Sequence, residues 1–144
     1  MVYHQAVLMK TTNTARILYV EDDHDDRFFL NESAISFSLP AEITYASDGN
    51  EAIDYLKKSN KNLPSLIVLD LNMPKLDGKE TLAIIKDDPA YSKIPVIVLS
   101  TSENKEDKDF CKSKGVISYL IKPGHFNEYE LIIKSFLPFL PSPA

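Results

Sequence analysis

Acidic side chains stand directly after two apolar runs of the sequence. Asp70 follows the unbroken run Leu66–Leu69, and Glu21 and Asp22 follow a second, largely apolar run, Arg16–Val20. Apolar runs without polar alternation are typical of strands buried on both faces of a parallel sheet. Because an open α/β sheet places its ligands at the carboxyl ends of its strands, we expect these carboxylates to share one pocket.

Three carboxylates in one pocket repel one another strongly and need a cation. Hard oxygen ligands select Mg²⁺ or Mn²⁺, which keep part of their water shell and favour phosphate as a further ligand. Two later apolar runs, Val96–Leu99 and Ile117–Ile121, end at the hydroxyl of Ser100 and the ammonium of Lys122, which suit an anion. Together these groups would clamp a phosphoryl group held by Asp70.

Each of these residues also has a simpler interpretation. Glu21 and Asp22 could open a helix, where acidic residues favour the helix dipole, and Asp70 or Ser100 could cap a turn or a helix. Lys122, which precedes a proline, could be a solvated loop lysine. Taken singly, these interpretations are at least as good. It is improbable that all five of these residues fall at strand ends by chance, so we favour the interpretation that they share one site.

The elements that must position the site alternate between strand and helix patterns five times, with short links. This order predicts right-handed βαβ units, and hence an α/β fold in which helices cover both faces of a parallel sheet. The run 42–46 alternates between apolar and polar residues, which indicates an edge strand. The first helix should begin near Asp25, with Phe28, Phe29 and Ile35 as its apolar face. Further helices are expected after Gly49, over 79–87, over 103–114 and from Phe126 to Pro138.

The length of 144 residues indicates one globular domain over 15–140, between a mobile N-terminal tail (1–14) and a short C-terminal tail (141–144). With a net charge of −5, the chain lacks the basic surface that sequence-independent nucleic-acid binding needs. No apolar run approaches a membrane span, and the lone cysteine, Cys111, fits a reducing cytosol. We therefore expect a cytoplasmic protein with neither nucleic acid nor a membrane as partner.

Four segments of the chain resemble the receiver domain of two-component response regulators. The similarity covers about 16–137, and its motifs are ILYVEDD (17–23), LIVLDLNMPKLDG (66–78), IPVIVLSTS (94–102) and YLIKP (119–123). The resemblance implies a flavodoxin-like (βα)5 three-layer sandwich whose parallel strands follow the order 2-1-3-4-5.

The resemblance further implies that Asp70 accepts a phosphoryl group from a histidine kinase. Asp22 and Asp70 would ligate Mg²⁺, with Mn²⁺ as an alternative. Glu21 would act partly through water, and Asn72 would contribute its backbone carbonyl. Apart from its own phosphorylation and dephosphorylation, such a domain is not expected to be an enzyme.

In the same family pattern, Ser100 and Lys122 would bind the phosphoryl oxygens. Tyr119 matches the aromatic switch of the family, although a half-buried sheet tyrosine is the simpler alternative. Receivers mostly carry Ala or Gly after the switch hydroxyl, whereas here Thr101 and Ser102 follow and would control phosphate access. This run is similar to small stand-alone receivers, including those paired with phytochrome-type kinases, so a phytochrome-type or hybrid histidine kinase is the expected partner.

Two other functions fit parts of the pattern. A Mg²⁺-dependent phosphohydrolase of the aspartyl-phosphate type carries D-x-D, but Asp70-Leu71-Asn72 lacks the second aspartate that would act as a general acid. A pseudo-receiver scaffold would have lost Asp70 or Lys122, and both are present.

The surface made by 103–114, 117–121 and the last helix is expected to report the switch. The last helix is apolar over more than one stripe, which suggests a homodimer or kinase interface. The alternative is a tail folded onto its own domain. The apolar residues of this segment are Phe126, Tyr129, Leu131, Ile132, Ile133, Phe136, Leu137, Phe139 and Leu140.

Overall fold

The computed structural model describes residues 15–73 and 75–141, so the expected N-terminal tail, Pro74 and residues 142–144 lie outside the described part. One sheet of five parallel strands has the order β2-β1-β3-β4-β5, which confirms the flavodoxin-like topology. The strands are β1 (Ala15–Val20), β2 (Ala41–Ala46), β3 (Leu66–Leu69), β4 (Val96–Ser100) and β5 (Ser118–Ile121). The α-helices are α2 (His24–Ser36), α3 (Gly49–Ser59), α4 (Gly78–Asp87), α5 (Lys105–Ser113) and α6 (Tyr129–Phe136).

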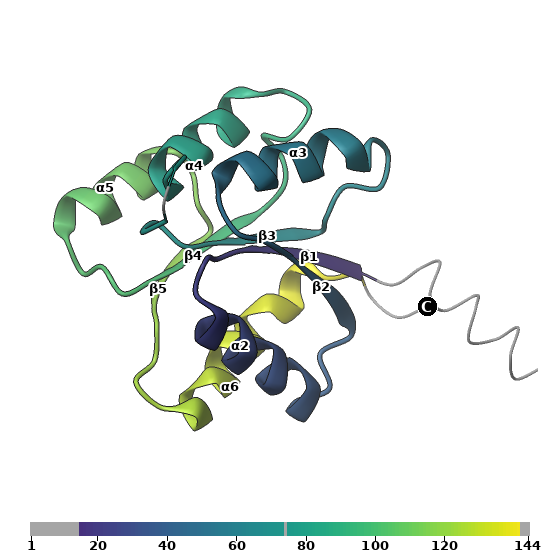
Figure 1. Cartoon of the computed structure of the whole chain (residues 1–144), viewed down its shortest axis with the longest axis vertical. Coiled ribbons are helices and arrows are strands. Elements are labelled where there is room, and N and C mark those ends of the chain that lie inside the picture. Colours follow the sequence, from purple (N-terminus) through teal and green to yellow (C-terminus); the bar gives the residue numbers. More distant parts are fainter. Residues whose placement is uncertain (1–14, 74, 142–144) are drawn as a thin grey trace, which may run out of the picture.

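Two helical layers cover the sheet, with α3, α4 and α5 on one face and α2 and α6 on the other (Figure 1). Alternate residues of β1 enter the two cores: Leu18 and Val20 pack with the first layer, and Ile17 and Tyr19 pack with the second. Cys111 of α5 is fully buried in the first core. The strands β3 and β4 are buried throughout, whereas β2 is mostly half-buried, so the predicted edge strand is confirmed.

Aspartate side chains fix the starts of three helices close to the carboxyl edge of the sheet. Asp23, Asp48 and Asp77 each accept a hydrogen bond from the backbone N–H three residues further on, at 3.0, 2.9 and 2.9 Å. These caps satisfy donors that the helix leaves unpaired and set the residue at which each helix begins. The helices α2, α3 and α4 therefore begin at defined positions beside the strand ends.

The apolar face predicted for α2 is wrong. Phe28, Phe29 and Ile35 are 58%, 38% and 66% exposed. The ring of Phe29 instead lies beside that of Phe126, with 6.3 Å between the ring centroids. Only one of the residues that α2 buries, Leu30, is a large apolar side chain, so the hydrophobicity of single residues does not decide which stripe of this helix is covered. The residues that α2 buries are Leu30, Ser33 and Ala34.

The last helical segment has three parts, in which short 3₁₀ turns at 126–128 and 137–139 flank α6. Leu131 of α6 is 73% exposed, whereas Phe139 and Leu140 are half-buried against the core of this layer. The end of the segment thus folds onto its own domain, and part of the predicted apolar surface is covered. Within residues 15–73 and 75–141, no helix is both long and apolar enough to cross a bilayer.

Gly78, the first residue of α4, offers a test of the packing beside the end of β3. A Cβ at this position would collide with the backbone of Asp70 and Leu71, so we expect Gly78→Ala to lower the free energy of unfolding by about 1–3 kcal/mol. Gly124→Ala is the matched control, because a Cβ there meets nothing within 4 Å. Denaturant unfolding of both variants gives the comparison, and equal stability of the two would contradict this account of Gly78.

Candidate metal and phosphoryl site

The carboxyl ends of β1 and β3 bring three carboxylates together. One oxygen from each of Glu21, Asp22 and Asp70 lies within 4.8 Å of the other two, as the sequence predicted. Glu21 and Asp70 are buried and Asp22 is exposed, so the cluster opens to solvent on one side. Asn72 is exposed, and its backbone N–H donates to Asp70 Oδ1 at 3.3 Å. Carboxylate oxygens gathered in this way suit Mg²⁺ or Mn²⁺, so these residues could hold a metal ion.

Backbone hydrogen bonds of the sheet place the two buried acids. The N–H of Glu21 donates to the carbonyl of Ala46 at 2.9 Å, and the N–H of Asp70 donates to the carbonyl of Val20 at 3.1 Å. Both residues therefore extend the ladder one step beyond their strands. The hydroxyl of the buried Tyr19 donates to Glu21 Oε1 at 3.2 Å, which orients that carboxylate within the pocket.

Lys122 joins the carboxylates from the end of β5. Its backbone N–H donates to the carbonyl of Ser100 at 2.9 Å, which extends the ladder between β4 and β5. Its Nζ lies 2.6 Å from Glu21 Oε1, 2.7 Å from Asp26 Oδ2 and 3.5 Å from Asp70 Oδ2, and only 9% of its side chain is exposed. The structure thus brings the predicted ammonium and acids together, and Lys122 is not a solvated loop lysine.

Two residues of α2 belong to this site although the sequence analysis did not assign them to it. The carboxylate of Asp26 is an ion-pair partner of Lys122. The guanidinium of Arg27 donates to the carbonyl of Glu21 and to the hydroxyl of Ser47, each at 2.6 Å, and so ties α2 to the ends of β1 and β2. Both residues lie in the first turn of α2, directly after the acid pair, and a charged residue in that turn is the signal that could have found them.

Burial and like charge shift the proton affinities in the pocket. Burial, together with the nearby carboxylate of Asp70, raises the pKa of Glu21 to about 8, although Lys122 opposes the shift. Burial also raises the pKa of Asp70 above its ordinary value, again against the effect of Lys122. Burial alone would lower the pKa of Lys122, but hydrogen bonds to Asp26 and Glu21 outweigh it and raise that pKa. A second cation, such as a metal ion, would therefore stabilise the ionised form of these acids.

The end of β4 and the loop that follows it form a hydrogen-bond network. Ser100 is fully buried, and its Oγ accepts the backbone N–H of Ser102 at 3.2 Å. The hydroxyl of Ser102 donates to Asp107 Oδ2 at 2.6 Å, and Asp107 is also paired with Lys79 of α4. Thr101 is exposed. The loop after β4 is thus connected to the first turns of both α4 and α5.

Tyr119 of β5 contacts the same loop. Its half-buried side chain donates a hydroxyl hydrogen bond to the carbonyl of Ser102 at 2.7 Å. The Nζ of Lys108 lies 5.9 Å from the centroid of its ring, within the range of a cation–π contact. Tyr119 is therefore positioned to respond to movement of the residues that follow Ser100.

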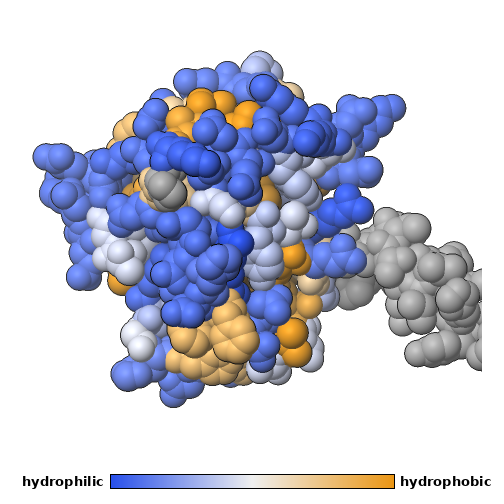
Figure 2. Space-filling model, in the orientation of Figure 1, coloured by the Kyte–Doolittle hydropathy of each residue, from blue (hydrophilic) through white to orange (hydrophobic). Residues whose placement is uncertain are grey.

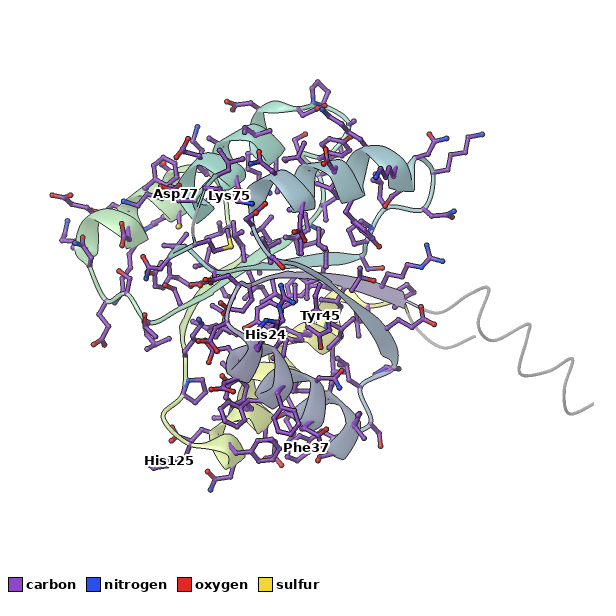
Figure 3. All side chains as sticks on the ribbon, in the orientation of Figure 1. His24, Phe37, Tyr45, Lys75, Asp77 and His125 are labelled. Carbon is purple, nitrogen blue, oxygen red and sulfur yellow. The ribbon has the colours of Figure 1, made fainter. Side chains whose placement is uncertain are left out.

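The histidines of the described chain do not form a joint metal site. Figure 3 shows His24 at the first turn of α2 and His125 in the loop that precedes the 3₁₀ turn at 126–128, well apart from each other. Both are exposed. The candidate metal ligands are therefore oxygen atoms.

Comparisons with known proteins agree with this geometry. A family model described as the response regulator receiver domain matches residues 17–134. Response regulator Rcp1 of Synechocystis sp. is 35% identical over 127 residues, which cover 85% of this chain and 86% of Rcp1. The structure of the phosphorylated cyanobacterial phytochrome response regulator RcpA has a TM-score of 0.79 at 38% identity and covers 89% of this chain and 99% of its own.

The Mn²⁺-bound form of Rcp1 has a TM-score of 0.77 at 33% identity, again covering 89% of this chain and 99% of its own. The family model and these relatives extend over nearly the whole described chain. This protein therefore belongs to the response regulator receiver family of two-component signalling.

Proposed function

We propose that this chain is a single-domain response regulator in which Asp70 accepts a phosphoryl group from a histidine kinase. The supporting observation is the position of Asp70, a buried carboxylate that lies in a cluster with Glu21 and Asp22 and 3.5 Å from the Lys122 ammonium. The carboxylate oxygen attacks phosphorus while the bond from phosphorus to the histidine nitrogen breaks, and the electron pair of that bond returns to the imidazole. The chain catalyses this transfer, and the later hydrolysis of its own acyl phosphate, but no other reaction.

We assign the metal to Asp22 and Asp70 as direct ligands, with Glu21 acting through water and the backbone carbonyl of Asn72 as a further oxygen donor. Mg²⁺ is the expected ion and Mn²⁺ an alternative, because both prefer hard oxygen ligands and accept phosphate oxygens. Bound there, the ion would offset the charge of the acids and of the incoming phosphoryl group. Lys122 and Ser100 are assigned to the phosphoryl oxygens, as a cation and a hydroxyl donor.

Replacement of Asp70 tests the phosphoacceptor. Acetyl phosphate with Mg²⁺ should give the wild-type protein an adduct that is stable to acid and labile to base, as expected of an acyl phosphate. Asp70→Asn removes the nucleophilic oxygen and should abolish the adduct, as measured by intact-protein mass spectrometry. Persistent labelling of this variant at a serine or histidine would refute the assignment.

Replacement of Asp22 tests the metal site. Asp22→Ala removes a direct ligand and should weaken Mg²⁺ binding by about tenfold or more, measured by isothermal titration calorimetry. Glu21→Gln should weaken it less, because Glu21 acts through water. Asp25→Ala is the control, since it removes the same charge from an exposed position on α2. Equal loss of affinity in Asp22→Ala and Asp25→Ala would mean that only net charge matters.

The pH of the same titrations reports on Glu21. Because the pKa of Glu21 is raised to about 8, this side chain carries a proton below that pH, and the proton must leave before the carboxylate can assist the metal. Mg²⁺ affinity should therefore rise as the pH increases from 6 to 9, by up to about tenfold per unit. The rise should be smaller in Glu21→Gln, and an equal rise in both proteins would contradict the role given to Glu21.

We propose that phosphorylation is reported by the surface of α5, β5 and α6. A phosphoryl group on Asp70 would draw Ser100 toward it, and the loop through Thr101 and Ser102, which also control phosphate access, would follow. Tyr119 would then break its hydrogen bond to Ser102 and turn to a new position. This movement changes the surface that a partner contacts. Because RcpA is a phytochrome response regulator, a phytochrome-type or hybrid histidine kinase is the partner we propose.

We also propose self-association through α6. Its segment carries Leu131, Phe126 and Leu137 at 73%, 42% and 46% exposure, and Figure 2 shows apolar surface among hydrophilic residues over the layer of α2 and α6. Exposed apolar side chains favour burial against a second copy.

Sedimentation velocity at several concentrations, with and without phosphorylation, tests this interface. Leu131→Glu should shift the protein toward monomer. Ile84→Glu is the control, because Ile84 is 42% exposed on α4, in the opposite layer, and should leave association unchanged. A monomer under all conditions would rule out the interface, as would an equal effect of the two variants.

A further inference from the structure

Asp26 lies in the first turn of α2, but its side chain turns into the pocket. It is 25% exposed and makes the hydrogen bond to Lys122 Nζ at 2.7 Å. Its neighbour Asp25 is exposed and belongs to no ion pair among residues 15–73 and 75–141. One acid of this turn therefore contacts the site, while the adjacent acid faces solvent.

The ammonium of Lys122 lies closer to Asp26 than to the proposed phosphoacceptor. The distance from Nζ to Asp70 Oδ2 is 3.5 Å, 0.8 Å longer than the 2.7 Å to Asp26 Oδ2 (3.5 − 2.7). Nζ has three N–H donors, and its two nearest oxygens belong to Glu21 and Asp26. A phosphoryl group brings about −1.5 to −2 charges and three acceptor oxygens, so it would compete with Asp26 for this one cation.

The place of Asp26 in the helix makes it an effective competitor. Its backbone N–H donates to Asp23 Oδ1 at 3.0 Å, so the residue is fixed in the capped first turn. A negative charge in the first turn is favoured by the helix dipole. The backbone of Asp26 is thus fixed in the capped turn, and the ion pair orders the long side chain of Lys122.

We propose that Asp26 is a positioning residue that holds Lys122 back from the phosphoryl site in the resting protein and releases it when Asp70 is phosphorylated. The proposal rests on the proposed function of Asp70 as phosphoacceptor. Lys122 moves from Asp26 toward the phosphoryl oxygens, and the first turn of α2 loses its contact with the end of β5. The free energy of this ion pair is thereby subtracted from the affinity of the site for the phosphoryl group.

Beryllofluoride, an anionic mimic of a phosphoryl group on a carboxylate, gives a direct test. Its affinity in saturating Mg²⁺ is measured by isothermal titration calorimetry for the wild type, Asp26→Asn, Asp26→Glu and Asp25→Asn. Asp26→Asn should bind about three- to tenfold more tightly than the wild type, because Lys122 no longer leaves an ionic partner. Asp26→Glu, which keeps the charge, should remain near the wild-type affinity. Asp25→Asn, which removes the same charge outside the site, should change it by less than about twofold.

The outcomes separate this role from others. A merely structural role of Asp26 would leave binding unchanged or weaken it, so unchanged or weaker binding by Asp26→Asn overturns the proposal. Equal tightening in Asp25→Asn overturns it as well, because net charge alone would then be responsible. If the wild type binds no beryllofluoride, the function proposed for Asp70 fails. If the wild type binds and Asp26→Asn matches it, only the role of Asp26 fails.

Discussion

A single ammonium group contacts three carboxyl groups at the carboxyl edge of the sheet. Lys122 Nζ lies within 3.5 Å of oxygens from Glu21, Asp26 and Asp70, and Glu21 and Asp70 are buried. A buried carboxylate without a partner costs several kcal/mol, so the placement of these acids depends on Lys122 reaching them. It reaches them only because β1, β3 and β5 end at the same edge. A register shift of one residue in any of these strands would turn its terminal side chain to the opposite face and separate the charges.

The residues of the site that could be predicted are those fixed by the end of a strand. Asp70 follows a fully buried apolar run, which is typical of a strand covered on both faces of a sheet. Glu21 and Lys122 were located by the ends of their own apolar runs, since the carboxyl ends of parallel strands meet at one edge of the sheet. The order of the strands in the sheet could not be predicted from the residues alone. Alternation in 42–46 indicated an edge, but the complete order came from resemblance to a family.

What could not be predicted depends on how α2 docks. The hydrophobicity of Phe28 and Phe29 suggested an inward face, yet these rings flank the helix while the smaller Ala34 meets the core. Which face of α2 is buried depends on how the helix packs against the sheet and α6, and the sequence of α2 alone does not determine that packing. The same packing turns Asp26 toward Lys122 and Arg27 toward Glu21. An error in the helical face therefore also hid two residues of the site.

The burial of Cys111 protects the thiol from reagents in the folded protein. The side chain is fully buried, and burial raises its pKa to about 11, so at neutral pH the group is a protonated thiol shielded from reagents. Alkylation of the native chain must then wait for the core between the sheet and α5 to open. The rate at which Cys111 is alkylated therefore measures how often this part of the core opens. A spectroscopic label attached to a cysteine introduced on the surface would find no competing site in the folded protein, because Cys111 is the chain's single natural cysteine.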